Sequence, residues 1–107
     1  MSAVPAKVPG VAAYDFSAPV WLWRGDSAWH FLTVPTDVSD EIDELSRGRT
    51  GGFGSVRVEV TIGSTTWRTS LFPSKDVGAY ILPVKKAVRV AEGCEDGVMA
   101  EVSLRML

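Results

Sequence analysis

The sequence holds few of the residues from which metal and redox sites are built. Its 107 residues include one cysteine and one histidine. A single cysteine excludes a disulfide within the chain and supplies no set of metal ligands. We therefore expect no metal and no cofactor, and the cysteine usage favours a reducing cytosol.

The sequence also lacks long apolar runs and a strong excess of one charge. No stretch approaches the roughly 18 apolar residues of a membrane-spanning helix, and the first residues do not follow the pattern of a signal peptide. With 11 basic and 13 acidic residues, the formal net charge is -2. The chain thus has no overall positive field to hold nucleic acid. Membrane and nucleic-acid partners are both disfavoured, and the predicted localisation is cytoplasmic.

The clearest pattern present is a pair of alternating segments. Branched residues at every second position of 56–62 alternate with polar ones, which is typical of a strand with one buried face. Gly63-Ser64 suits a two-residue hairpin turn. Residues 65–72 alternate again until Pro73 ends the strand. The pattern therefore predicts a β-hairpin.

The same reasoning predicts the other elements. Further strands are expected at 11–24, with an interruption at 17–19, and at 28–34, 80–82 and 98–106. Short amphipathic helices are expected at 38–47 and 84–92. The residues predicted to share one core are Val58, Val60, Ile62, Val102 and Leu104.

About six strands and two short helices make the predicted fold mainly β. A small closed or split barrel capped by the helices is favoured, because closure removes exposed sheet edges. We expect a single domain over residues 11–107 and a disordered tail at 1–10. The glycine-rich run at 48–54 is expected to be a flexible connection.

Three segments of the sequence carry motifs. Residues 29–35 follow the pattern W-x-F-x-x-x-P, residues 67–73 follow W-x-T-S-L-x-P, and residues 80–89 follow Y-x-L-P-V-x-K-x-V-R. In these motifs the chain resembles a bacterial family, the domain of unknown function (DUF) 1905, over about residues 14–105. The resemblance implies a double-split β-barrel, distantly AbrB-like, and implies no activity. One departure is the last turn, where Asp96-Gly97 replaces the family's Gly-Asp.

The tryptophans are the first candidate site. Indole rings offer a large contact area and one N–H donor, so they are suited to lining an aromatic cavity. The alternative is that they fill a barrel short of leucine and isoleucine. Trp29 and Trp67 are expected in the core, and Trp21 and Trp23 partly exposed on one strand face. The candidate cavity residues are Trp21, Trp23, Trp29 and Trp67.

The start of the second predicted helix is the other candidate. Lys85, Lys86 and Arg89 lie there with unpaired backbone N–H groups, an arrangement that suits an anion. Arg68 and Tyr80 are candidate neighbours in this anion site. The alternative is a solvated helix face.

No catalytic residue is identified. His30 has no second histidine or cysteine to share a metal, and it is expected at the surface or the barrel rim. Cys94 precedes two acids, which disfavour a reactive thiolate, so it is expected to be inert. The prediction is a non-enzymatic binding or interaction module, monomeric or homodimeric, for a small anionic ligand or a protein partner. The alternatives are an AbrB-like nucleic-acid-binding or regulatory domain and an enzyme with a tryptophan-lined cavity. The acidic helix at 38–47 weighs against nucleic acid, because phosphate neutralisation dominates such binding.

Overall fold

The computed structural model describes residues 13–25, 28–46 and 54–107. The fold is mainly β, as predicted, with seven strands and two helices in these ranges. The strands are β1 (Ala13–Pro19), β2 (Trp21–Arg24), β3 (Ala28–Thr33), β4 (Val56–Ile62), β5 (Thr65–Ser74), β6 (Ala79–Pro83) and β7 (Met99–Met106). The helices are α1 (Thr36–Ser46) and α2 (Lys86–Glu92). The tail expected at 1–10, and the expected connection at 48–54 apart from Gly54, lie outside the described residues.

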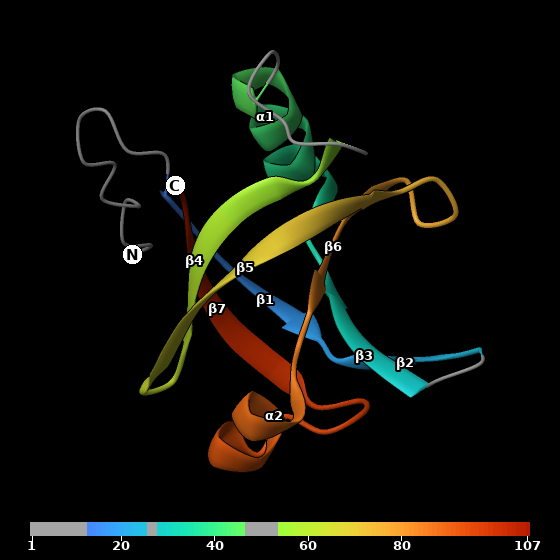
Figure 1. The fold of residues 1–107 in the computed structure, drawn as a ribbon, viewed down its shortest axis with the longest axis vertical. Helices are drawn as coiled ribbons and strands as arrows, with labels where there is room; N and C mark the ends of the chain where they lie inside the picture. Colours follow the sequence, from blue (N-terminus) through green and yellow to red (C-terminus); the bar gives the residue numbers. More distant parts are fainter. Residues whose placement is uncertain (1–12, 26–27, 47–53) are drawn as a thin grey trace.

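The strands form one curled antiparallel sheet in the order β1-β7-β4-β5-β6-β3-β2 (Figure 1). Its two end strands, β1 and β2, follow each other in the chain with only Val20 between them. The Val20 N–H donates to the Val98 carbonyl at 2.9 Å, and the Val20 carbonyl accepts from the Gly97 N–H at 2.7 Å. Before Val20 the chain pairs with β7, and after it the chain pairs with β3. This change of partner divides the segment 11–24 in two, so the expected six strands become seven.

The concave side of the sheet encloses an aliphatic core. The predicted core residues Val58, Val60, Ile62, Val102 and Leu104 are all buried, which confirms the strand register. The largest fully buried side chains are Leu32, Ile42, Leu71, Leu82, Leu104, Val20, Val34, Val58, Val60, Val88 and Cys94. No aromatic side chain is among them in the described part of the chain. Aliphatic side chains therefore fill the centre of the core, and Trp67 packs against its side.

Helix α1 closes one end of the curled sheet (Figure 1). It begins before the expected residue 38, because the Ser39 N–H already donates to the Pro35 carbonyl at 2.8 Å. The buried Ser39 hydroxyl donates to the Val34 carbonyl and accepts from the Tyr80 N–H, both at 3.1 Å. The Tyr14 hydroxyl donates to Glu41 Oε2 at 2.7 Å. These bonds attach α1 to the strands that flank it.

Helix α2 lies at the opposite end (Figure 1) and begins later than the expected residue 84. The Val84 N–H still donates to the His30 carbonyl at 2.9 Å, so Val84 continues the sheet pairing of β6. Gly93, with a φ of 66°, ends the helix in the left-handed conformation that glycine favours. The Thr65 hydroxyl donates to Glu92 Oε2 at 2.6 Å, which ties α2 to the β4–β5 turn. Neither helix is long and apolar enough to cross a membrane.

Candidate functional site

The convex face of β2, β3, β6 and β5 carries a continuous group of apolar side chains. Residues paired directly across antiparallel strands point to the same face. The pairs on this face are Trp21 with Phe31, Trp23 with Trp29, Phe31 with Pro83, and Phe72 with Ile81. Four strands from two separate parts of the sequence therefore present neighbouring aromatic and aliphatic groups.

These side chains line a hollow of about 540 Å³, which we call the aromatic groove. Its aromatic lining consists of Trp21, Trp23, Trp29, Phe31 and Phe72. Its other lining residues are Ser74, Asp76, Val77, Ile81 and Pro83. The volume lies within the roughly 300–1,000 Å³ typical of small-molecule sites. A mostly apolar lining with a few polar groups is also typical of such sites.

Contacts between the rings hold one wall of the groove in place. The ring centroids of Trp21 and Phe31 lie 5.1 Å apart with a 36° tilt. Those of Trp29 and Phe31 lie 6.3 Å apart and are stacked with planes 15° apart. The Trp21 indole N–H donates to the Thr33 hydroxyl at 2.9 Å. Phe31 thus contacts both tryptophans, and the wall is ordered before any ligand arrives.

The outer part of the groove is exposed to solvent. The exposed fractions are 47% for Trp23, 52% for Trp29 and 43% for Phe72. The expectation that Trp29 lies in the core is therefore wrong. Leu32 takes the inward position on β3 with 0% exposure, and the alternation of a strand then directs Trp29 and Phe31 outward. Trp21 is half-buried and Trp23 exposed, as predicted.

The position of Trp23 depends on the residue that follows its strand. The Trp23 ring lies over Gly25, and a Cβ at residue 25 would meet the Trp23 Cζ2 and Cζ3 atoms at 2.6 Å. Any larger residue at this position would have to displace the indole. The absence of a side chain at Gly25 therefore lets the Trp23 ring take its position in the groove.

Trp67 lies elsewhere. It pairs with Val60 across β4 and β5, and its half-buried side chain packs against the aliphatic core. It is not among the residues that line the aromatic groove. The structure thus brings together Trp21, Trp23 and Trp29 and leaves Trp67 on the concave side with the core.

The candidate anion-binding residues are not all brought together. Tyr80 is buried at the α1 end, where its hydroxyl donates to Asp43 Oδ1 at 3.5 Å. Lys85 and Lys86 are exposed at the α2 end. Arg89 donates to the Val84 carbonyl at 3.3 Å and to Glu95 Oε1 at 3.2 Å, so its guanidinium is already engaged. The helix itself has 7 residues, which is too short for a strong dipole at its start.

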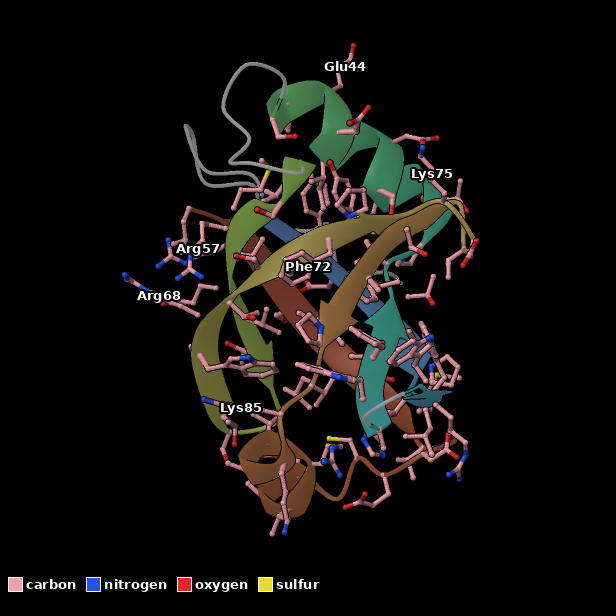
Figure 2. All side chains as sticks on the ribbon, turned by 45° about the vertical axis from the view of Figure 1, so that its right-hand side comes forward. Glu44, Arg57, Arg68, Phe72, Lys75 and Lys85 are labelled. Carbon is pink, nitrogen blue, oxygen red and sulfur yellow. The ribbon has the colours of Figure 1, made fainter. Side chains whose placement is uncertain are left out.

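The fifth member of that set, Arg68, extends from the convex face of β5 beside Arg57 (Figure 2). Arg68 Nε lies 3.4 Å from Glu59 Oε2, and Arg105 Nε lies 2.8 Å from Glu59 Oε1. The hydrogen bond from Arg105, with help from Arg68, lowers the pKa of the Glu59 carboxyl. Two of the arginines on this face are thus paired with one carboxylate within the described structure.

His30 and Cys94 lie apart from the groove. His30 pairs with Leu22, on the strand face opposite Trp29. Cys94 is 2% exposed, and burial, with the nearby Glu92 carboxylate, raises the pKa of its thiol. Among the residues described, no group of three or more His, Cys, Asp or Glu side chains is arranged to hold a metal ion. Ser74 and Asp76 are the polar groups that line the groove, and Ser74 Oγ accepts a hydrogen bond from the Val77 N–H at 3.3 Å.

Several lining residues were not among the sequence candidates. Phe31, Phe72 and Ile81 belong to the groove, and one signal for Phe72 was present in the sequence. Phe72 falls on the same face of its strand as Arg68 and Ser70. An aromatic side chain among polar side chains that point outward is a candidate for binding. No comparable signal marks Ile81 or Asp76.

Comparison with known proteins agrees with the motifs. The sequence profile described as "Domain of unknown function (DUF1905)" matches residues 16–104, and the chain belongs to this family. No curated protein matched the sequence.

Proposed function

We propose that this DUF1905 domain is a non-enzymatic binding module whose ligand occupies the aromatic groove. One observation carries the proposal: five aromatic side chains from three strands line a single hollow on the convex face. They lie outside the core, and the aliphatic residues already fill the concave side. The aromatic rings are therefore available for recognition and are not needed to close the fold.

The exposure of these rings favours a ligand energetically. A large aromatic side chain buries about 150–250 Å² when it is fully covered. At about 25 cal/mol per Å², covering the exposed half of Trp23, Trp29 or Phe72 is worth about 2 kcal/mol each. Part of this gain offsets the cost of association. Contact with these rings therefore favours a ligand that has apolar surface of its own to bury.

The order of the groove supports the same proposal. The Phe31 ring contacts two tryptophans, and the Trp21 indole donates a hydrogen bond to Thr33. A surface that is ordered in advance loses less entropy when a ligand binds. The groove offers one hydroxyl, which is already an acceptor for a backbone N–H, and one carboxylate. This set suits orientation of a ligand better than acid–base or nucleophilic chemistry.

We also propose that the fold is a double-split β-barrel within a single domain. The sheet has two halves, β1-β7-β4-β5 and β5-β6-β3-β2, and two stretches of chain link them. Strand β5 pairs with β4 up to Leu71 and with β6 from Phe72, and the β1–β2 segment changes partner at Val20. An experimental structure in which either stretch pairs with only one half would overturn this assignment.

Titration with a neutral fluorescent probe tests the binding function. N-phenyl-1-naphthylamine brightens on entering an apolar site, and we expect saturable binding at one site per chain. Trp29→Ala and Phe72→Ala should each weaken it about tenfold or more, because each removes an exposed wall of the groove. Leu45→Ala is the matched control, since Leu45 is 45% exposed on α1 and does not line the groove. Probe binding that is unchanged by both groove variants would contradict the proposal.

A further inference from the structure

The groove contains one ionisable side chain among the described residues that line it, and this side chain is acidic. Asp76 lies in the turn between β5 and β6, exposed at the side of the groove near Val77. The groove thus combines an apolar aromatic wall with a single negative charge.

Strand alternation directs the basic side chains of β2 and β3 away from the groove, and Arg68, on the same face of β5 as Phe72, does not line the groove and is paired with Glu59. Arg24 follows Trp23 on β2, and His30 lies between Trp29 and Phe31 on β3, so both belong to the opposite strand face. Lys75 precedes Asp76 but lines a separate hollow with Asp40 and Asp43 of α1. Figure 2 shows Lys75 near α1 and Lys85 beside α2, at opposite ends of the molecule.

The aromatic faces add to the negative character of the site. The face of an indole or phenyl ring carries the negative part of its quadrupole and attracts a cation within about 6 Å of the ring centre, most strongly for tryptophan. Trp23 and Trp29 pair directly across β2 and β3, and about half of each residue is exposed, so part of each ring is open to such a group. Phe72 lies across the groove on β5, the strand that leads into the turn of Asp76.

We propose that the ligand of the aromatic groove is a small organic cation with an apolar shell, of the quaternary or alkylated ammonium class. This inference rests on the proposed function and adds the ligand's charge. The alkyl groups cover the exposed rings, the ring faces attract the positive charge, and Asp76 supplies the counter-charge. The earlier expectation of an anionic ligand concerned the α2 end and does not apply to this groove.

A comparison of isosteric probes tests the charge. Choline, the neutral 3,3-dimethylbutan-1-ol and the anionic 3,3-dimethylbutanoate share nearly the same apolar end. We expect choline to bind about three- to thirtyfold more tightly than the neutral alcohol, as measured by tryptophan fluorescence at constant ionic strength. The anion should bind most weakly. Equal or tighter binding of the alcohol, or no binding of choline, would overturn the inference.

A charge-neutral variant tests the part played by Asp76. Asp76→Asn should weaken choline binding about two- to fivefold and leave the neutral alcohol unaffected, because a partly exposed ion pair contributes little more than this. Glu44→Gln is the control, since Glu44 is an exposed carboxylate on α1 far from the groove (Figure 2). Equal effects of the two variants on choline binding would remove Asp76 from the site. If the naphthylamine probe binds and choline does not, the binding function stands and the cation inference fails.

Discussion

The two sides of the same strands differ in chemistry. On the concave side, Leu32, Leu71 and Leu82 are fully buried. On the convex side, their immediate neighbours Phe31 and Phe72 line the groove, and Phe72 is 43% exposed. Mainly aliphatic side chains fill the interior, whereas the five aromatic side chains of the groove lie where the sheet leaves a surface uncovered. The difference indicates that one face of these strands specifies the fold and the other is available for recognition.

The largest expected effect is a difference in unfolding free energy between variants at two adjacent residues, one on each face of β5. Leu71→Ala should lower the free energy of unfolding by about 2–5 kcal/mol, because it leaves a cavity in the core. Phe72→Ala should lower it by about 1–2 kcal/mol, because its side chain is only partly buried and its loss leaves no enclosed cavity. Urea denaturation monitored by circular dichroism measures both. Similar losses for the two variants would mean that the convex face also holds the fold together.

A second prediction concerns the support beneath the groove. The Ser39 hydroxyl bonds to both Val34 and Tyr80, and Tyr80 precedes the groove residue Ile81. Ser39→Ala should cost about 1–3 kcal/mol in unfolding free energy, because a buried N–H and carbonyl lose their partner. Ser103→Ala, which removes an exposed hydroxyl bonded to Asp15, should cost less than about 0.5 kcal/mol. Equal losses for the two variants would show that the buried hydrogen bonds of Ser39 add no more stability than an exposed one.

A third prediction concerns alkaline pH. Burial raises the pKa of the Tyr14 phenol well above its usual range, with help from the hydrogen bond to Glu41. The folded state therefore holds this proton more tightly than the unfolded state. The resulting stability is present below the ordinary tyrosine pKa of about 10 and is lost as pH rises above it.

Unfolding free energies measured from pH 8 to pH 11 test this. The wild type should lose stability relative to Tyr14→Phe over the upper part of that range, because the variant has no phenol to ionise. Tyr14 and Glu41 lie on the α1 side of the molecule and do not line the groove. Ligand binding in the groove should therefore not show the same dependence on pH. Parallel curves for the two proteins would contradict the raised pKa.

The fourth prediction concerns the stability of Trp29→Ala. With 52% of Trp29 exposed, its truncation should lower the unfolding free energy by about 1–2 kcal/mol, because only half of the side chain is buried on folding. Thermal denaturation of the variant beside Leu45→Ala measures this. A loss above about 3 kcal/mol would place Trp29 with the core residues and would weaken its assignment to recognition.

Alternation in the sequence was sufficient to predict the core of the hairpin and the last strand. A period of two fixes which side chains share a face, and Val58, Val60 and Leu104 are branched apolar residues among polar ones. The same rule could not orient β3. Trp29 and Phe31 on one face and Leu32 on the other are all apolar, so the pattern does not show which side turns inward.

The groove depends on contacts that the sequence pattern does not contain. Phe31 and Phe72 lie on the two strands that flank β6, and they line one groove only because β3 and β5 both pair with that strand. Strand order is set by tertiary packing of the whole sheet. The helix-start site was a prediction from local sequence alone. In the fold, Arg89 turns to Val84 and Glu95, and Tyr80 lies at the other end of the molecule.

Mapping a small neutral aromatic probe by amide NMR tests the central claim most directly. Benzyl alcohol, added to the uniformly ¹⁵N-labelled chain, should shift amide signals saturably at residues 21–24, 28–31, 72–77 and 81–83, which carry the groove. Signals of the core strands β4 and β7 and of α2 should move little, and the pattern should disappear in the Trp29→Ala and Phe72→Ala double variant. Shifts that centre on α2 or the α1 hollow, or that persist unchanged in the double variant, would contradict the account.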